Sequence, residues 1–156
     1  MSVTAWRLTK QKLSRTAFSG EGARLYGGRW NSPGVAMVYT AQTQSLAALE
    51  LLVHLDWPAL LNRYVLIQVT IDESLILKLE LREWPRNWRA SPAPARLREI
   101  GNAWIESSKS VALQVPSAVV PGESNFLINP RHPDFDRIKI GRALPFRYDP
   151  RLRHRK

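Results

Sequence analysis

Apolar residues recur along the chain with helical spacing in some segments and with strand-like alternation in others, which predicts a mixed fold. Residues 45–55, SLAALELLVHL, are apolar almost all round, a pattern typical of a helix buried on several sides. Thr43 or Ser45 is placed to cap the start of this helix. Glu50 falls within the apolar stripe of the same helix, so its carboxylate needs either a structural partner or a function.

A second helix is predicted to start after a proline-rich stretch and to continue through residue 106. Its apolar residues at helical spacing are Leu97, Ile100 and Trp104. Gly101 would permit close packing of another segment against this helix. The preceding stretch, 84–95, is predicted to be a connecting loop that is too short to separate two domains.

Several segments have the composition or alternation of strands, and they are residues 35–40, 64–71, 74–81 and 136–140. The stretch 110–120 adds one or two short strands broken at Pro116. The second and third segments are expected to be neighbouring strands around Asp72 and Glu73, and residues 121–135 are expected to form a loop. These patterns predict an α+β fold, a single mixed α/β domain.

The composition narrows the classes of protein to which the chain can belong. Its 156 residues are 44% hydrophobic and 23% charged, which is typical of one globular domain. It contains no cysteine, which excludes disulfides and zinc–thiolate sites, and its three histidines show no metal-ligand spacing. The N-terminus does not resemble a signal peptide and no segment has the length of a membrane span, so we expect a cytoplasmic protein without a metal site.

The charge favours anionic partners without selecting one. The net charge is +10 and the pI is about 10.7, which suits nucleic acid, a nucleotide or an acidic protein. Part of the excess lies in the tail, 147–156, interpreted as a solvated basic terminus after a domain at 1–146. A basic nucleic-acid-binding module remains an alternative, although no recognised binding motif is present.

A few polar residues stand where ligand-binding groups are often found. Arg29 follows two glycines in GGRWN, and Tyr39 ends the predicted strand before the Glu50 helix. Ser124 and Asn125 lie in the predicted loop near the end of the chain. Each has an ordinary structural alternative, such as a surface arginine at a bend, a core tyrosine or turn-forming side chains.

Taken together, three motifs resemble a known family. They are WRLT near the N-terminus, GGRWNSPGVAMVYTAQTQSLAALELLVHL in the first half and PGESNFLINPRHPDF near the end. In this order, over roughly residues 5–146, the chain resembles the RES domain family. The family's Arg, Glu and Ser map to Arg29, Glu50 and Ser124, and its strand-end tyrosine maps to Tyr39.

The resemblance implies a fold like that of the ADP-ribosyltransferases and a toxin of a bacterial toxin–antitoxin pair. Such a toxin would degrade NAD by cleaving the nicotinamide–ribose bond, as a phosphorylase or a glycohydrolase, and would arrest growth. Protein mono-ADP-ribosylation is an alternative, as is a non-enzymatic partner that retains only the fold. NAD would be the substrate, with inorganic phosphate as an optional second substrate, and no prosthetic group is expected.

The resemblance also implies a partner and roles for the mapped residues. The partner would be an Xre-like helix–turn–helix antitoxin, which alone would contact DNA; a homodimer within the complex stays open, and no membrane is involved. Arg29 would hold the pyrophosphate or adjoining ribose, beside two glycines that let NAD approach the backbone, and Tyr39 would contact the nicotinamide side. Glu50 would stabilise the developing sugar cation, and Ser124 and Asn125 would bind ribose or phosphate oxygens.

Overall fold

The computed structural model of the chain describes residues 1–152, and residues 153–156, which include His154, lie outside the described part. A single seven-stranded sheet runs through the molecule in the order β4-β5-β6-β2-β1-β3-β7. Its strands are β1 (Ser2–Lys10), β2 (Val38–Ala41), β3 (Tyr64–Asp72), β4 (Ile76–Lys78), β5 (Ala112–Pro116), β6 (Ser124–Ile128) and β7 (Lys139–Phe146). The pairs are antiparallel except for β4 with β5, so the mixed α/β fold is confirmed.

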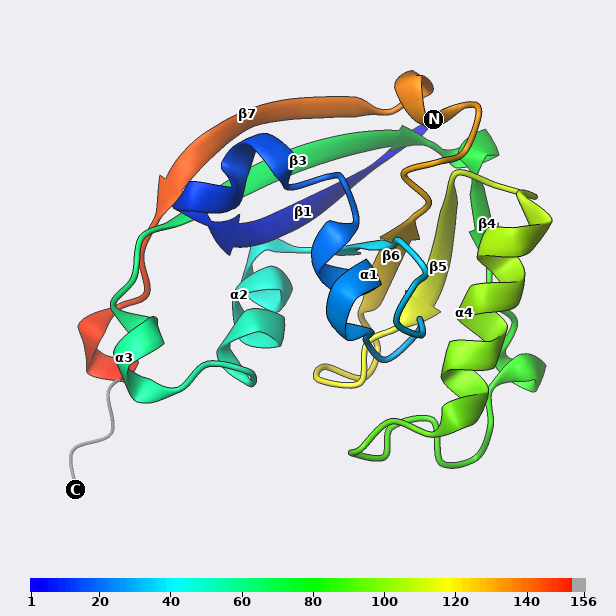
Figure 1. Cartoon of the computed structure of the whole chain (residues 1–156), viewed down its shortest axis with the longest axis horizontal. Helices are drawn as coiled ribbons and strands as arrows, with labels where there is room; N and C mark the ends of the chain where they lie inside the picture. The colour runs from blue at the N-terminus through cyan, green and yellow to red at the C-terminus, as the bar shows by residue number, and fades with distance from the viewer. Residues whose placement is uncertain (153–156) are drawn as a thin grey trace.

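Four helices accompany this sheet, and α3 lies beyond its edge near the start of β3 (Figure 1). They are α1 (Glu21–Tyr26), α2 (Gln44–Leu52), α3 (Trp57–Leu60) and α4 (Ala95–Ser107). Short 3-10 turns occupy Gln11–Thr16, Glu73–Leu75, Leu81–Glu83, Phe135–Arg137 and Pro150–Leu152. The hydroxyl of Thr43 caps α2 by accepting the Leu46 N–H at 3.0 Å, which confirms one of the two predicted caps.

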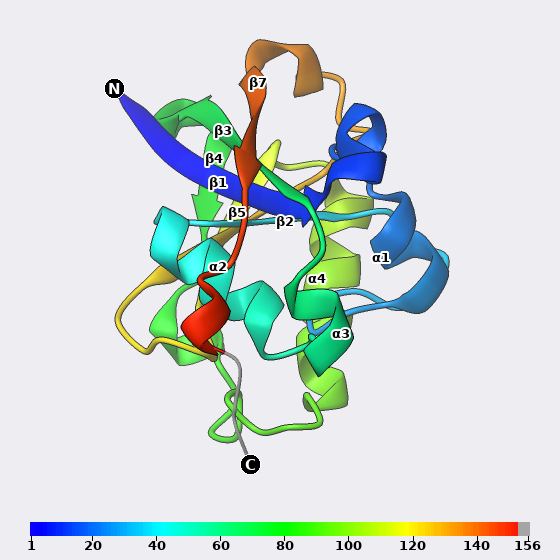
Figure 2. The same ribbon diagram turned by 90° about the vertical axis from the view of Figure 1, so that its left-hand side faces the viewer.

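The sheet divides into two parts that are joined at one point. The β1–β3 ladder pairs every residue from Ser2 to Lys10, whereas β1 and β2 pair only at Trp6 and Ala41. Beyond that pair β2 leaves β1 and continues with β6, β5 and β4, so the sheet bends sharply, as Figures 1 and 2 show. Helix α2 contacts both β1 and β2 beside this junction.

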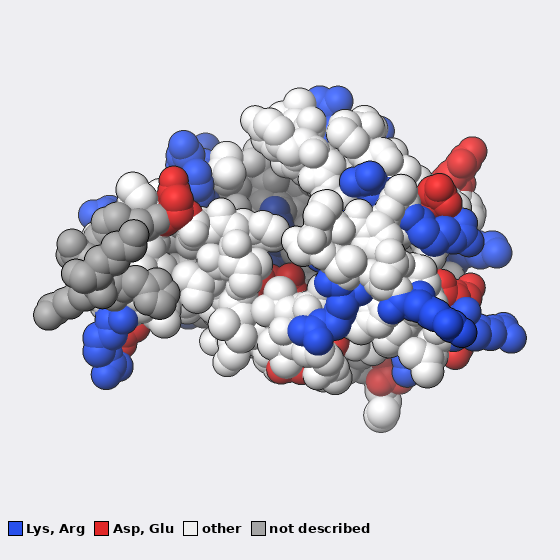
Figure 3. Space-filling model, turned by 90° about the horizontal axis from the view of Figure 1, so that it is seen from below, with Lys and Arg blue, Asp and Glu red and all other residues white. Residues whose placement is uncertain are grey.

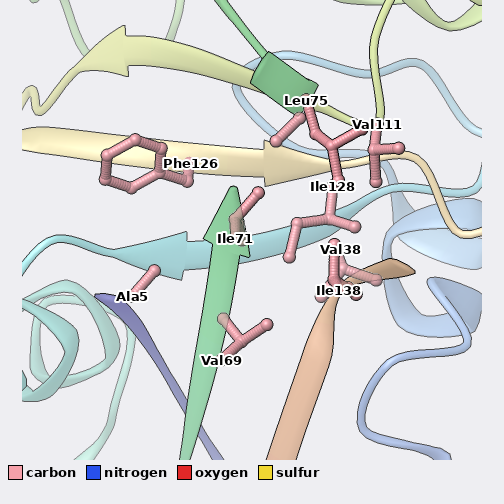
Figure 4. Packing of buried hydrophobic residues seen from close by; sticks show 10 residues of the cluster. Ala5, Val38, Val69, Ile71, Leu75, Val111, Phe126, Ile128 and Ile138 are labelled. Atoms are coloured by element: carbon pink, nitrogen blue, oxygen red, sulfur yellow. The ribbon is translucent and has the colours of Figure 1, made fainter. Parts of the chain in front are cut away.

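The main core lies between the two parts of the sheet, where β3 crosses β2 and β6 steeply (Figure 4). Its buried residues are Ala5, Val38, Val69, Ile71, Leu75, Val111, Ala112, Phe126, Ile128 and Ile138. A second cluster packs α2 on β1 and β3, and a third packs α4 on β5 and β6 around Trp30, Leu97 and Trp104. Burial of these apolar side chains is the main stabilising contribution to the bent sheet.

Two expectations about the strands are wrong. The segment 74–81 is not a neighbour of β3: only Ile76–Lys78 is a strand, and it pairs in parallel with β5. The reason is local, because Asp72 accepts the Ser74 N–H and starts a 3-10 turn instead of a hairpin. The predicted loop 121–135 contains β6, a strand between β2 and β5, since Phe126 and its two apolar successors are buried there.

The other differences concern the ends of elements. Strand β2 starts at Val38 instead of residue 35, helix α2 ends at Leu52, and β7 extends to Phe146. Helix α4 and the connecting loop before it are confirmed. The chain after residue 146 begins as part of the fold, because Tyr148 is buried against α2 and its hydroxyl donates to the Ala48 carbonyl.

Gly101 provides the first test of this packing. A Cβ on Gly101 would lie 1.7 Å from the Trp30 carbonyl oxygen, which confirms the predicted close approach to α4. We expect Gly101→Ala to lower the free energy of unfolding by about 2 kcal/mol or more, because backbone atoms must move apart. Urea unfolding measures this, and Gly22→Ala in α1, where a Cβ meets nothing within 4 Å, is the matched control. Equal stabilities of the two variants would contradict the packing described.

Candidate functional site

Helix α2, which carries Glu50, lies at the bottom of Figure 1 together with the loops 84–94 and 117–123, which bond to Arg29 and Glu50. Figure 3 views this side directly and shows a hollow near its centre, with a basic side chain in its depth and an acidic side chain at its edge. This side of the molecule therefore has a hollow that opens to solvent, with charges of both signs near it.

The hydroxyl of Tyr39 is turned inward and makes two hydrogen bonds. It accepts the N–H of Trp30 at 3.0 Å and donates to the Oδ1 of Asn31 at 2.6 Å. Burial raises the pKa of Tyr39 well above its ordinary value, so this hydroxyl keeps its proton at neutral pH. The hydroxyl proton is already donated to Asn31. The predicted contact of Tyr39 with nicotinamide therefore stays a prediction, and it concerns the ring.

Asn31 is a residue that the sequence analysis missed. It is fully buried, and its Nδ2 donates to the carbonyls of Ala23 at 2.8 Å and Val35 at 3.0 Å. Because its side-chain oxygen also holds Tyr39, one amide joins α1, the loop 27–35 and β2. The signal available in the sequence was an asparagine within a turn-forming cluster, which ordinarily indicates no more than a turn.

The two glycines before Arg29 have an internal function that differs from the expected one. A Cβ on Gly28 would lie 2.6 Å from the Tyr39 hydroxyl, and Gly27 has a φ of +73° and packs on Pro33. The glycines therefore make room for Tyr39 and for the turn. Close approach of a ligand to this backbone is not needed to explain them.

Arg29 is held by the loop that precedes α4. Its Nη1 donates to the carbonyl oxygens of Trp88 and Ala90, both at 3.0 Å. These bonds use both protons of Nη1, whereas Nε and Nη2 have no hydrogen-bond partner within residues 1–152. The Nε–Nη2 edge is the one that a guanidinium commonly presents to an oxyanion through two parallel hydrogen bonds.

Arg7 brings a second guanidinium to the junction of the two sheet parts. From β1 its Nε donates to the Ala17 carbonyl at 3.0 Å and its Nη1 to the Tyr39 carbonyl at 3.2 Å. Burial lowers the pKa of Arg7 to about 10, so the group remains protonated at neutral pH. No ion pair with a carboxylate is formed by Arg7 in the part of the chain that the structure describes. Backbone carbonyls thus orient this guanidinium without neutralising its charge.

Glu50 is held by a serine that the motif comparison passed over. The N–H groups of Val119 and Val120 donate to the Oγ of Ser117 at 3.1 and 3.0 Å. Both lone pairs of this hydroxyl are then occupied, so its single proton is donated to Oε1 of Glu50, 2.8 Å away. Ser117 is fully buried and Glu50 is half-buried, which explains how a carboxylate is accommodated on an apolar helix.

Ser124 and Asn125 occupy the start of β6, and within residues 1–152 neither forms a hydrogen bond with Glu50. The Oγ of Ser124 accepts the Nε2 of Gln114 at 3.0 Å, and Asn125 donates its Nδ2 to the Thr40 carbonyl at 3.3 Å. Both side chains are partly exposed, and their predicted contact with a ligand stays a prediction.

The predicted site residues do not line the two hollows described next. Two hollows, of about 410 and 190 Å³, lie near opposite ends of β3, and the larger is lined by Lys10, Gln11, Lys12, Asn62 and Arg63. Within residues 1–152, no group of three His, Cys, Asp or Glu side chains is arranged to hold a metal ion. Over the same residues, no helix has the length and apolarity to cross a membrane.

The model of the RES domain family matches residues 4–149. The chain belongs to the RES domain family. This RES domain is 43% identical over 149 residues to Toxin Res of Yersinia enterocolitica. The matched region covers 95% of this chain and 98% of that protein. It is 39% identical over 158 residues to Prs ADP-ribosylating toxin of Sphingobium sp., and this match covers 97% of this chain and 98% of the relative.

A solved structure supports the same assignment at the level of the fold. A chain of the Mycobacterium tuberculosis MbcT–MbcA toxin–antitoxin complex superimposes with a TM-score of 0.74, covering 97% of this RES domain and 87% of that chain. Only 19% of the residues are identical, so the likeness is one of fold. The resemblance inferred from the three motifs is confirmed by the family match.

Tyr39→Phe tests the inward network of this RES domain. The substitution leaves the Trp30 N–H and the side-chain Oδ1 of Asn31 without a partner, so we expect a loss of about 1–3 kcal/mol in the free energy of unfolding. Urea unfolding measures the loss, and Tyr26→Phe, at a side chain that is 84% exposed, is the matched control. A destabilisation no larger than that of the control would contradict the network.

The raised pKa of Tyr39 predicts how this difference depends on pH. The pKa of Tyr39 is higher in the folded protein than in the unfolded chain, where tyrosine has a pKa of about 10. Below about pH 10 the hydroxyl is protonated in both states, so it contributes its full stabilisation. Above that pH the unfolded chain loses the proton first, so the stabilisation decreases. The stability difference between wild type and Tyr39→Phe should therefore shrink between about pH 9 and about pH 11. A difference that stays constant over this range would show that the hydroxyl is not shielded.

Proposed function

We propose that this RES domain is the toxin of a toxin–antitoxin pair and that it consumes NAD by breaking the nicotinamide–ribose bond. The observation that carries the proposal is the Glu50 carboxylate, which the buried Ser117 hydroxyl holds at its Oε1 on a helix packed against β1 and β2. The names of relatives 43% and 39% identical, Toxin Res and ADP-ribosylating toxin, support both parts of the proposal.

The reaction needs a negative charge at a defined place. When the bond between ribose C1′ and the nicotinamide nitrogen breaks, its electron pair leaves with nicotinamide, which departs as a neutral molecule. Positive charge then develops on C1′ and the ring oxygen, as in other glycosyl transfers. A carboxylate fixed by Ser117 stabilises this charge or hydrogen-bonds a ribose hydroxyl without having to reorient during the reaction.

Two guanidinium groups are suited to the diphosphate of NAD. Arg29 presents the Nε–Nη2 edge described above, and Arg7 is a protonated group without a carboxylate partner among the described residues. Paired hydrogen bonds from a guanidinium to phosphate oxygens are stronger than neutral ones and fix the orientation of the anion. Bound in this way, the diphosphate would anchor NAD while Glu50 acts at the far ribose.

The other predicted residues take narrower roles in the proposal. The ring of Tyr39 would border the nicotinamide half, because its hydroxyl is engaged with Trp30 and Asn31. Ser124 and Asn125 would bind ribose or phosphate oxygens from the start of β6. Nicotinamide leaves as a neutral molecule, so no general acid is required at the site.

The acceptor defines the type of enzyme. In the proposal an oxygen of inorganic phosphate bonds to C1′, which makes the enzyme a phosphorylase, or water adds and gives up one proton, which makes it a glycohydrolase. Transfer to a protein side chain is a second candidate, favoured by the name of the Sphingobium relative. The partner proposed for the cell is an Xre-like antitoxin in the cytoplasm, and the complex in which the M. tuberculosis neighbour was solved supports a partner of the antitoxin class.

NAD consumption by the purified chain tests the proposal. We expect NAD loss with release of nicotinamide, and Glu50→Gln should lower kcat by about 100-fold or more because the stabilising charge is removed. Chromatography with mass detection identifies the product in the presence and absence of inorganic phosphate. Glu106→Gln, at an exposed carboxylate on α4, is the control for the charge change.

Expression of the same variants in bacteria links the chemistry to growth. Wild type and Glu106→Gln should arrest growth, whereas Glu50→Gln should not. Full NAD consumption by a folded Glu50→Gln protein would exclude the assigned role of this carboxylate. Wild type that labels a protein and leaves free NAD intact would favour the second candidate.

The two serines are expected to affect different kinetic constants. Ser117→Ala removes the donor to Glu50, so kcat should fall about tenfold or more while KM changes little. Ser124→Ala removes a proposed contact with the substrate, so KM for NAD should rise while kcat is largely retained. Steady-state kinetics on both variants distinguishes the roles. A fall in kcat for Ser124→Ala alone would contradict the assignment of Ser117.

A further inference from the structure

Three consecutive residues of the loop before α4 connect the two halves of the proposed site. The carbonyls of Trp88 and Ala90 both accept from Nη1 of Arg29 at 3.0 Å. Between them, Arg89 points to the other loop, and its Nε donates to the carbonyl of Ala118 at 3.0 Å. We refer to residues 88–90 as the bridge.

The far end of the bridge leads to Glu50. Ala118 follows Ser117, whose hydroxyl accepts from the N–H groups of Val119 and Val120 and donates to Glu50. The Ala118 carbonyl therefore belongs to the turn that fixes the carboxylate. Hydrogen bonds, joined by short stretches of backbone, therefore connect Arg29 through the bridge and this turn to Glu50, although these residues come from four separate parts of the sequence.

The bridge has an anchor at one side and is exposed at the other. Trp88 packs with the third core cluster and meets Trp84 edge to face, with ring centroids 5.1 Å apart. Arg89 is exposed, forms no ion pair within residues 1–152 and has the Ala118 carbonyl as its hydrogen-bond partner. The Arg89 bond is charge-assisted, which makes it stronger than a neutral hydrogen bond, and it joins the bridge to the turn that holds Ser117.

We infer that Arg89 is a positioning residue that sets the distance between Arg29 and Glu50. This distance suits a substrate in which a diphosphate and an N-glycosidic bond lie at a fixed separation. This inference rests on the proposed function. Without the Arg89 contact, the 117–120 turn and Glu50 can move relative to the diphosphate-binding edge of Arg29. A displacement of the carboxylate affects the transition state more than the binding of NAD, since the charge it stabilises develops only there.

The test uses one matched control and one conservative variant on the full chain. Arg89→Ala removes the contact, and Arg89→Lys keeps a donor of similar reach. Arg86→Ala removes the same charge from the same loop at an exposed arginine that makes no hydrogen bond or ion pair within the described residues. Comparison with Arg86→Ala separates the contact from the general effect of positive charge on an anionic substrate.

Amide hydrogen exchange is the first measurement, because it does not depend on activity. We expect Arg89→Ala to speed exchange several-fold at the N–H groups of Val119 and Val120, and Arg86→Ala to leave it unchanged. Arg89→Lys should restore part of the protection. Unchanged exchange at both amides in Arg89→Ala would overturn the inference, whether or not the protein consumes NAD.

Steady-state kinetics with NAD is the second measurement. Arg89→Ala should lower kcat about fivefold with little change in KM, and Arg89→Lys should recover most of the loss. In a Ser117→Ala background the Arg89→Ala effect should disappear, because the turn no longer holds Glu50. A rise in KM alone, or equal effects of Arg86→Ala and Arg89→Ala, would overturn the inference. Wild type without any NAD consumption would instead refute the proposed function, while the exchange experiment would still decide whether the bridge holds the turn.

Discussion

The structure depends on the single residue pair, Trp6 with Ala41, at which β1 and β2 meet. A sheet that paired these strands along their whole length would be continuous and would leave no opening beside them. Because pairing stops there, the four-stranded part turns away from the three-stranded part, and α2 packs beside the junction. Arg7 donates to the Tyr39 carbonyl at this point, so a guanidinium satisfies backbone oxygen where the ladder ends. The same divergence that shapes the core therefore leaves a protonated guanidinium bonded to backbone carbonyls at the junction.

The loop that carries Arg29 owes its shape to neutral hydrogen bonds and close packing. The Asn31 amide, the Tyr39 hydroxyl and the glycine backbone fit together so tightly that a Cβ on Gly28 would overlap Tyr39. On the other side the Trp30 carbonyl lies against the helix backbone at Gly101. Such contacts restrict movement of the loop in several directions, because each partner belongs to a different element. The conformation of Arg29 is thus fixed before any ligand binds, which is what strong binding of an anion requires.

The charged groups of the proposed site are held by neutral groups instead of by each other. Glu50 bonds to a buried hydroxyl, and Arg29 and Arg7 bond to backbone carbonyls. An ion pair between Glu50 and an arginine would neutralise both groups and would have to be broken when substrate binds. Neutral partners orient each charge and leave it able to act on a dinucleotide that carries negative phosphates and develops positive charge on its sugar. The separation of carboxylate and guanidinium groups is therefore a property of the two loops that hold them.

The sequence by itself determined the class of fold, the α2 and α4 helices, the family, and the residues Arg29, Tyr39 and Glu50 as candidates. It did so because helical periodicity, capping and ordered motifs are local along the chain. Only the tertiary structure decided that β4 pairs with β5, that residues 124–128 form a strand, and that Glu50 meets Ser117 instead of Ser124. It also revealed the buried amide of Asn31 and the reason for the glycines. These features depend on contacts between segments distant in sequence, whose partners no local pattern specifies.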